Sequence, residues 1–285
     1  MVIVDKINDM SNIARNIQKS DKNIGFVPTM GYFHKGHTSL FKKSKECTDI
    51  TIVSLFVNPT QFSPKEDFKT YPRDLDNDIR IAKEHNVDYL FVPTVQQMYP
   101  DNGTINIQMG TKQSVFEAVK RKGHFNGVVQ ILIKLFNIVM PNVVFMGQKD
   151  YQQTIVVKNL LNTFNYDIEL VICPTVREEN GLAMSSRNTY LSKEQIEEAL
   201  ILKRALDYTV DLVNKGERNK NTIEVLLKFF IRRNSNLVLD YASIVNAKDL
   251  LDIPRFTNEQ AVVLLAGTVD NVRLIDNCLI DFSTI

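Results

Sequence analysis

The fold is decided by the stretch Ile24-Gly25-Phe26-Val27-Pro28-Thr29-Met30-Gly31-Tyr32-Phe33-His34-Lys35-Gly36-His37. Its first four residues are apolar, as in a buried strand, and residues 38–43 can begin a helix. A glycine turn between a strand and a helix places backbone N–H groups where they can bind the phosphates of a nucleotide. The stretch therefore predicts a nucleotide-binding turn at the start of a helix.

Two histidines lie at the end of this stretch, three residues apart. At that spacing His34 and His37 share one face of the first helical turn, where both imidazoles can donate to one anionic group. This arrangement favours transfer of a phosphoryl or nucleotidyl group. The alternative is that both are ordinary packed or surface residues, since a short H-x-G-H sequence also arises by chance.

Apolar runs rich in β-branched residues recur along the first part of the chain, separated by helical segments. Runs of this kind, continuous rather than alternating, indicate a parallel sheet covered on both faces. We expect a doubly wound, Rossmann-like α/β domain over residues 1–175, with ligands bound beyond the carboxyl ends of its strands. The predicted strands are 24–27, 50–57, 89–92, 143–146 and 168–173.

The character of the sequence changes after residue 175. We expect a smaller α+β domain over residues 176–285, which would serve as a lid. Its predicted helices are 192–215 and 221–233, and its predicted strands are 239–245, 261–269 and 272–274.

Composition excludes several classes of protein. The 34 basic and 33 acidic side chains leave a net charge of +1, so we expect no nucleic acid partner. The sequence offers no targeting segment and no membrane-spanning run, so we expect a cytoplasmic protein without a membrane partner. Cys47, Cys173 and Cys278 lack metal-ligand spacing, and we expect all three to be buried thiols, with a catalytic cysteine as the alternative.

Three further polar segments follow predicted strands or a glycine-containing turn. Asn58 and Gln61 supply amides that suit the hydroxyl and carbonyl groups of a small polar substrate, although an Asn-Pro turn with a solvated glutamine is the alternative. Lys149 and Asp150 could bind a phosphate and nucleotide hydroxyls, or form a surface charge pair. The segment Met184-Ser185-Ser186-Arg187-Asn188 offers donors for phosphate oxygens, or is an exposed turn and helix cap.

In their order and spacing these motifs resemble the pantothenate synthetase family, the pantoate–β-alanine ligases of the nucleotidyltransferase superfamily. The resemblance runs from about residue 24 to the late segment Arg273-Leu274-Ile275-Asp276-Asn277. It implies that ATP and pantoate form a pantoyl adenylate with release of pyrophosphate. β-Alanine then attacks to give pantothenate and AMP. It also implies Mg²⁺ and a homodimer.

The resemblance assigns roles to residues at matching positions. The catalytic set is His34, His37, Lys149, Ser185, Ser186 and Arg187. The ATP-binding set is Pro28, Met30, His34, Gly36, His37, Gly147, Lys149, Asp150, Val176, Met184, Ser185, Ser186 and Arg187. The pantoate-binding set is Met30, Asn58, Gln61 and Gln153, and the acidic residue expected near Mg²⁺ and the incoming amine is Asp78.

The chain departs from the family pattern in two places. Lys122 stands where the family has proline and Asn126 where arginine is frequent, although Glu117, Arg121, His124 and Phe125 match. Residues 267–273 also differ, which leaves the register of the last strand open.

Three other classes of protein agree less well with these motifs. A nucleotidyltransferase that moves AMP onto a phosphorylated acceptor would need a basic acceptor pocket, which neutral Asn58, Gln61 and Gln153 do not supply. An aminoacyl-tRNA synthetase would need a basic tRNA-binding extension. A non-catalytic nucleotide-binding regulator would be expected to have lost part of the phosphate-binding set.

Overall fold

A computed structural model of the 285-residue chain describes residues 1–64, 66–100, 105–110, 115–253 and 260–280. The chain forms two compact units. The first unit comprises Met1–Gln148 and Gln152–Pro174, and the second comprises Lys149–Tyr151 and Thr175–Ile285. A three-residue segment in the middle of the chain thus belongs with the carboxy-terminal part.

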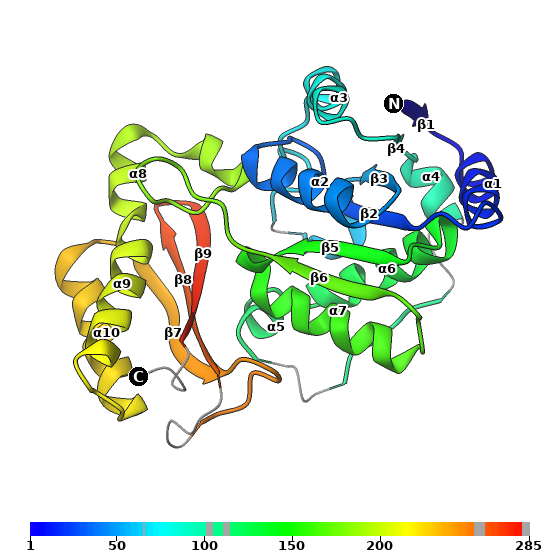
Figure 1. The fold of residues 1–285 in the computed structure, drawn as a ribbon. Coiled ribbons are helices and arrows are strands. Elements are labelled where there is room, and N and C mark those ends of the chain that lie inside the picture. The colour runs from blue at the N-terminus through cyan, green and yellow to red at the C-terminus, as the bar shows by residue number, and fades with distance from the viewer. Residues whose placement is uncertain (65, 101–104, 111–114, 254–259, 281–285) are drawn as a thin grey trace. The chain divides into compact units, whose positions relative to one another are not determined.

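The first unit is built on a parallel sheet of six strands in the order β1-β4-β3-β2-β5-β6 (Figure 1). This confirms the predicted doubly wound α/β fold, and all five predicted strands are present. The sheet has one further strand, β1, at its edge. The strands are β1 (Val2–Val4), β2 (Ile24–Thr29), β3 (Ile50–Leu55), β4 (Tyr89–Phe91), β5 (Val143–Gly147) and β6 (Glu169–Cys173).

Helices cover both faces of this sheet, because each face carries its own cluster of buried apolar side chains. One cluster joins the sheet to α1, α6 and α7, with Phe26 and Phe136 edge to face at its centre. The other joins the sheet to α2 and α3 through Val27, Phe41 and Ala82. The helices of the sheet-forming part are α1 (Ile7–Gln18), α2 (Lys35–Cys47), α3 (Leu75–Glu84), α4 (Val95–Met98), α5 (Glu117–Lys120), α6 (His124–Val139) and α7 (Tyr151–Thr163).

Strand order determines where a ligand can bind. From β2 the chain proceeds to β3 on one side, whereas β5 lies on the other, so the topological switch point is between β2 and β5. In open α/β sheets, ligands bind beyond the carboxyl ends of the strands at this point. The histidine-bearing turn leaves the end of β2, and Gly147 closes β5.

The second unit packs helices against an antiparallel sheet of three strands, as predicted. The region 192–215, predicted as one helix, is divided by Leu200 into α8 (Lys193–Ala199) and α9 (Ile201–Asn214). The strands are β7 (Val238–Asn246), β8 (Ala261–Val269) and β9 (Val272–Ile280), and the last helix is α10 (Lys220–Asn234). β9 is six residues longer than predicted, and its register with β8 runs from Val269 opposite Val272 to Ala261 opposite Ile280.

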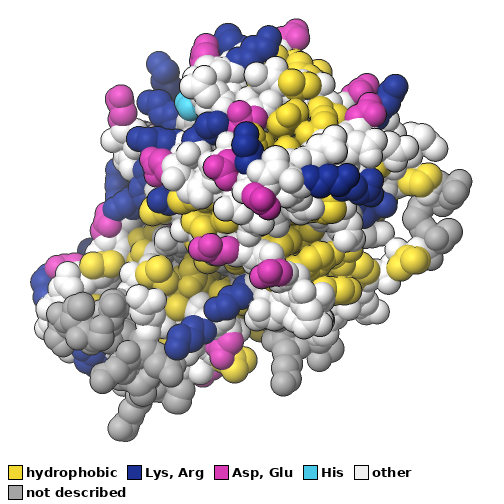
Figure 2. All heavy atoms as spheres, turned by 45° about the vertical axis from the view of Figure 1, so that its right-hand side comes forward, with side chains coloured by type: hydrophobic (Ala, Val, Ile, Leu, Met, Phe, Trp, Pro, Cys, Tyr) yellow, Lys and Arg dark blue, Asp and Glu magenta, His cyan; other side chains and the backbone are white. Residues whose placement is uncertain are grey.

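Figure 2 shows acidic and basic side chains interspersed over one face, in keeping with the net charge of +1.

Cys173 is buried, but Cys47 is exposed and Cys278 is half-buried, so the prediction of three buried thiols is wrong for Cys47. Within the described ranges, no helix combines the length and apolar character needed to cross a bilayer.

Candidate active site

The turn after β2 adopts a backbone conformation that needs support. Gly31 and Tyr32 both have positive φ, at 83° and 56°, and for Tyr32 this left-handed region is unfavourable. Asp78 of α3 provides the support, because its two carboxylate oxygens accept the N–H of Tyr32 at 2.8 Å and of Phe33 at 2.6 Å. The Phe33 ring packs edge to face on Phe41, which fixes the turn to the body of the unit.

The two histidines lie together, as predicted, with ring centroids 4.1 Å apart. His34 caps α2, and its Nδ1 accepts the N–H of Gly36 at 3.1 Å. The Nδ1 of His37 accepts the N–H of His34 at 3.2 Å. Because both Nδ1 atoms are acceptors, each neutral ring carries its proton on Nε2. The turn therefore presents two imidazoles in the tautomer that donates from Nε2.

Gln61 lies in the short 3₁₀ helix η1 (Pro59–Gln61) after β3, and Asn58 orients its side chain. Asn58 Nδ2 donates to Gln61 Oε1 and to the carbonyl of Gly127, both at 3.1 Å. Asn58 Oδ1 accepts the Tyr99 hydroxyl at 2.7 Å. Asn58 is 1% exposed and its amide is occupied by these contacts, so it supports Gln61 and is not placed to bind pantoate itself. Gln61 Nε2 lies 3.0 Å from the sulfur of Met30.

A buried histidine holds the backbone of Gln61. His124 Nδ1 lies 2.8 Å from the Gln61 carbonyl, and its Nε2 lies 3.0 Å from Nη1 of Arg121, which also pairs with Glu66. Arg121 can only donate, so the neutral ring carries its proton on Nδ1. Burial, followed by the Arg121 charge, lowers the pKa of His124 to about 4. Arg121 and His124, which match the family pattern, thus hold the backbone of Gln61 in place.

Helix α6 approaches η1 closely at Gly127. A Cβ atom at this position would lie 2.3 Å from the carbonyl oxygen of Thr60 and 2.6 Å from the nitrogen of Gln61. No side chain fits there without moving η1, so glycine is required by the close approach of the two segments.

Adjacent glutamines at the start of α7 have different surroundings. Gln152 is buried, accepts the N–H of Glu117 at 2.9 Å and donates to the carbonyl of Val115 at 2.9 Å. Gln153 is half-buried, and its side chain forms no hydrogen bond with the residues that the structure describes. Of the two, Gln153 is the one whose side chain is available, and its binding of pantoate stays a prediction.

In the second unit the phosphate-binding candidates lie on two segments. Lys149 and Asp150 form the 3₁₀ turn η4 (Gln148–Asp150) before α7, with Lys149 Nζ 3.3 Å from Asp150 Oδ1. Val176 to Met184 form a hairpin, closed by the N–H of Met184 donating to the carbonyl of Val176 at 3.0 Å.

The hairpin leads directly to the two serines and the arginine. Ser185 caps the 3₁₀ helix η5 (Ser186–Tyr190), accepting the N–H of Arg187 at 3.3 Å. Ser186 is buried and Arg187 is half-buried. The predicted donors therefore lie on one short, ordered segment.

The prediction that Asp78 is a Mg²⁺ ligand does not fit its environment. Asp78 is 1% exposed, and both of its oxygens already accept backbone N–H groups. Burial raises the pKa of its carboxyl, against the lowering effect of the bonds from Phe33 and Tyr32. Among the described residues, no group of three or more histidines, cysteines or carboxylates could hold a metal. The two hydrogen bonds of Asp78 support the histidine turn.

The predicted site residues divide between the units. The first unit brings together Pro28, Met30, Gly36, both histidines, Gln61 and Gly147 at the ends of β2, β3 and β5. The second unit carries Lys149, Asp150, Val176, Met184, Ser185, Ser186 and Arg187. The sequence did not predict the supporting roles of Asp78 and Asn58, because these depend on hydrogen bonds and not on motif position.

A doubly wound sheet with paired histidines beside its switch point defines a nucleotide-binding α/β enzyme. Comparison with known proteins narrows this class. The family described as Pantoate-beta-alanine ligase matches residues 2–279. The pantothenate synthetase of Caldicellulosiruptor saccharolyticus is 44% identical over 281 residues, covering 99% of this chain and 100% of the relative.

Comparison with solved structures points to the same family. The crystal structure of pantothenate synthetase from Thermus thermophilus matches with a TM-score of 0.91 and 36% identity, covering 98% of this chain and 99% of that one. A pantoate-beta-alanine ligase from Francisella tularensis, complexed with beta-gamma ATP and beta-alanine, matches with a TM-score of 0.79 and 34% identity, covering 98% and 97%. The chain belongs to the pantoate-beta-alanine ligase family and is an enzyme of pantothenate biosynthesis.

Proposed function

We propose that this chain joins pantoate to β-alanine in two steps at the expense of ATP. In the first step, a carboxylate oxygen of pantoate attacks the α-phosphorus of ATP, and the bond to pyrophosphate breaks. In the second, the amine of β-alanine attacks the acyl carbon, forming the amide and releasing AMP, while the amine loses its proton to solvent. Membership of the family supports this reaction.

The observation that carries the proposal is the histidine pair. Adenylation builds negative charge on the α-phosphoryl group and on the departing pyrophosphate. Two Nε2–H donors held by backbone hydrogen bonds to Nδ1 stabilise that charge without reorganisation. His34 and His37 act as donors to the phosphates, and Pro28, Met30 and Gly36 bring the turn against the nucleotide.

The second unit supplies the remaining nucleotide contacts in this proposal. Lys149 and Arg187 neutralise phosphate charge, while Ser185 and Ser186 donate to phosphate oxygens. Asp150 binds nucleoside hydroxyls. Val176 and Met184 of this unit, together with Gly147 of the first unit, complete the proposed set of nucleotide contacts. The lid role of residues 176–285 belongs to the same proposal.

Pantoate binds to uncharged amides. Gln61 and Gln153 contact its hydroxyl and carboxylate groups, Met30 packs against its apolar part, and Asn58 acts through Gln61. Because the acyl adenylate is already activated, the second step needs positioning of the amine and no enzyme nucleophile.

Three expectations remain parts of the proposal. Mg²⁺ accompanies the ATP substrate and is held through its phosphates, as is usual for this ion, where it offsets phosphate charge. The family implies a homodimer. A cytoplasmic location suits an enzyme that uses ATP.

The experiment is exchange of labelled pyrophosphate into ATP by purified protein with Mg²⁺, with and without pantoate. Pantoate-dependent exchange, followed by equal amounts of AMP and pantothenate once β-alanine is added, is the expected result. Exchange that does not need pantoate, or AMP formation without pantothenate, would refute the two-step reaction.

A further inference from the structure

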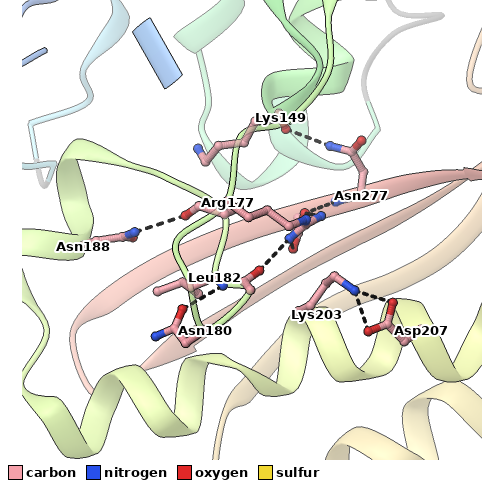
Figure 3. A network of polar contacts seen from close by, with 11 residues as sticks. Lys149, Arg177, Asn180, Leu182, Asn188, Lys203, Asp207 and Asn277 are labelled. Atoms are coloured by element: carbon pink, nitrogen blue, oxygen red, sulfur yellow. Dashed lines mark hydrogen bonds and ion pairs between the residues drawn. The ribbon is translucent and has the colours of Figure 1, made fainter. Parts of the chain in front are cut away.

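Two adjacent side chains of β9, Asp276 and Asn277, bond to the hairpin that leads to Ser185 and to the turn that carries Lys149. Both residues are buried, at 3% and 2% exposed. They lie in the segment that resembles the family's late motif, yet no role follows from that resemblance. Figure 3 shows Asn277 on the strand, with Lys149 and Arg177 on separate segments beside it.

Asp276 holds the hairpin that leads to the serines. Its carboxylate accepts two hydrogen bonds from Arg177, at 2.7 and 3.0 Å, in a bidentate pair. Arg177 Nη1 also donates to the carbonyl of Gly181 at 3.1 Å, across the tip of the hairpin. Arg177 and Ala183 are bridged through the backbone, so this ion pair fixes the base of the segment that continues into η5. Bidentate pairs of this kind fix orientation as well as distance.

Asn277 holds the lysine turn. Its Nδ2 donates to the carbonyl of Lys149 at 2.8 Å, a contact between residues 128 positions apart in the chain (Figure 3). The N–H of Asn277 in turn donates to Asp276 Oδ1 at 2.8 Å. The two anchors are therefore hydrogen-bonded to each other through adjacent residues of one strand.

We propose that Asp276 and Asn277 form a positioning pair that fixes the backbone of Lys149 and the Arg177 hairpin before ATP binds. Neither residue touches substrate in this proposal. A site whose donors are held in place loses less conformational entropy on binding than one whose segments must be ordered by the ligand. This inference rests on the proposed nucleotide-binding role of Lys149 and Arg187.

The alternative is that the pair stabilises the second unit without affecting the ligand. Buried hydrogen bonds and ion pairs often have that role alone. The two possibilities differ in one measurable respect. A positioning residue that acts through Lys149 loses its effect on nucleotide affinity once the Lys149 side chain is gone, whereas a general loss of stability has the same effect in both backgrounds.

The experiment is a double-mutant cycle on the affinity for a nonhydrolysable ATP analogue, measured by calorimetry. The variants are Asn277→Ala, Lys149→Ala and the double variant. The control is Asn234→Ala, which removes another amide bonded to a backbone carbonyl, that of Phe230, at the end of α10. We expect Asn277→Ala to weaken binding about tenfold, which is about 1.4 kcal/mol, and to have less than a twofold effect in the Lys149→Ala background.

A second variant keeps the proposal testable if Asn277→Ala does not fold. Asp276→Asn keeps the size of the side chain but removes its charge from Arg177, and we expect its effect on affinity to disappear in the Arg187→Ala background. Equal fold-changes in both backgrounds, or wild-type affinity in both variants, would overturn the positioning role. Failure of the proposed ligase function would give a different result. The wild-type chain would then make no pantothenate, while the double-mutant cycle would still show coupling between Asn277 and Lys149.

Discussion

Removing the charge of Asp78 tests whether this residue supports the histidine turn. Asp78→Asn keeps the shape of the side chain but leaves only one oxygen acceptor for the N–H groups of Tyr32 and Phe33. The amide nitrogen would face the other N–H, donor against donor. Since Tyr32 is held at a φ of 56°, the variant also loses support for an unfavourable conformation.

The expected magnitude follows from these contacts. A hydrogen bond to a charged group contributes about 1.5–3 kcal/mol, and a buried N–H left unpaired costs about 1–3 kcal/mol. We expect a loss of about 3 kcal/mol, which in a unit of this size lowers the melting temperature by about 6–12 °C. Because the imidazoles depend on the same turn, pantoate-dependent pyrophosphate exchange should fall by at least about tenfold.

The control is Asp76→Asn, which removes an exposed carboxylate from the same turn of α3. It should change the melting temperature by less than about 2 °C, as expected for a surface charge at a helix start. Thermal unfolding and the exchange rate at several Mg²⁺ concentrations form the assay. If Asp78→Asn keeps its stability and only requires more Mg²⁺, the residue is a metal ligand after all and the supporting role is refuted.

Three more predictions concern the first unit. His37→Ala should lower the adenylation rate by on the order of a hundredfold, as loss of a transition-state donor does, and an unchanged exchange rate would remove this histidine from the mechanism. Gly127→Ala should cost about 1–3 kcal/mol through the contact with Thr60 and raise KM for pantoate much more than KM for ATP; equal changes in both would contradict this. The pKa of His124 is lowered to about 4, so stability should fall as pH drops from about 6.5 to 4, by about 3 kcal/mol at most. In His124→Asn, which cannot be protonated, urea unfolding should show a pH slope smaller by one proton in that window, and an unchanged slope would refute the assignment.

The sequence predicted the interior strands because each is a continuous apolar run, and buried parallel strands need apolar side chains on both faces. β1 was missed since it has three residues and only Val4 is buried. The break at Leu200 has no proline or glycine to signal it, and Leu200 itself keeps helical dihedrals, at φ −61° and ψ −16°. The elements that were missed are thus a short edge strand with one buried residue and a bend without a helix-breaking residue.

For the site, motif spacing proposed candidate ligand-binding residues but not the residues that hold them in place. Asp78 bonds to residues 45 and 46 positions earlier, and no local pattern shows such a contact. The resemblance assigned the same position to Mg²⁺, and the sequence alone does not distinguish a carboxylate that binds a metal from one that accepts backbone hydrogen bonds. The amide of Asn58 was assigned to pantoate, because two of the partners that occupy it, Tyr99 and Gly127, are distant in the sequence.

The division of the chain into two units affects when each part can fold during synthesis. All strands of the parallel sheet have emerged once β6 is made, so this part can fold first, as domains generally do. Lys149–Tyr151 belong to the other unit, and their partners Ala247 and Asn277 are made about a hundred residues later. The lysine turn can therefore take up its hydrogen bond with Asn277 only after β9 has been made, so in our proposal the turn reaches its final position later than the parallel sheet.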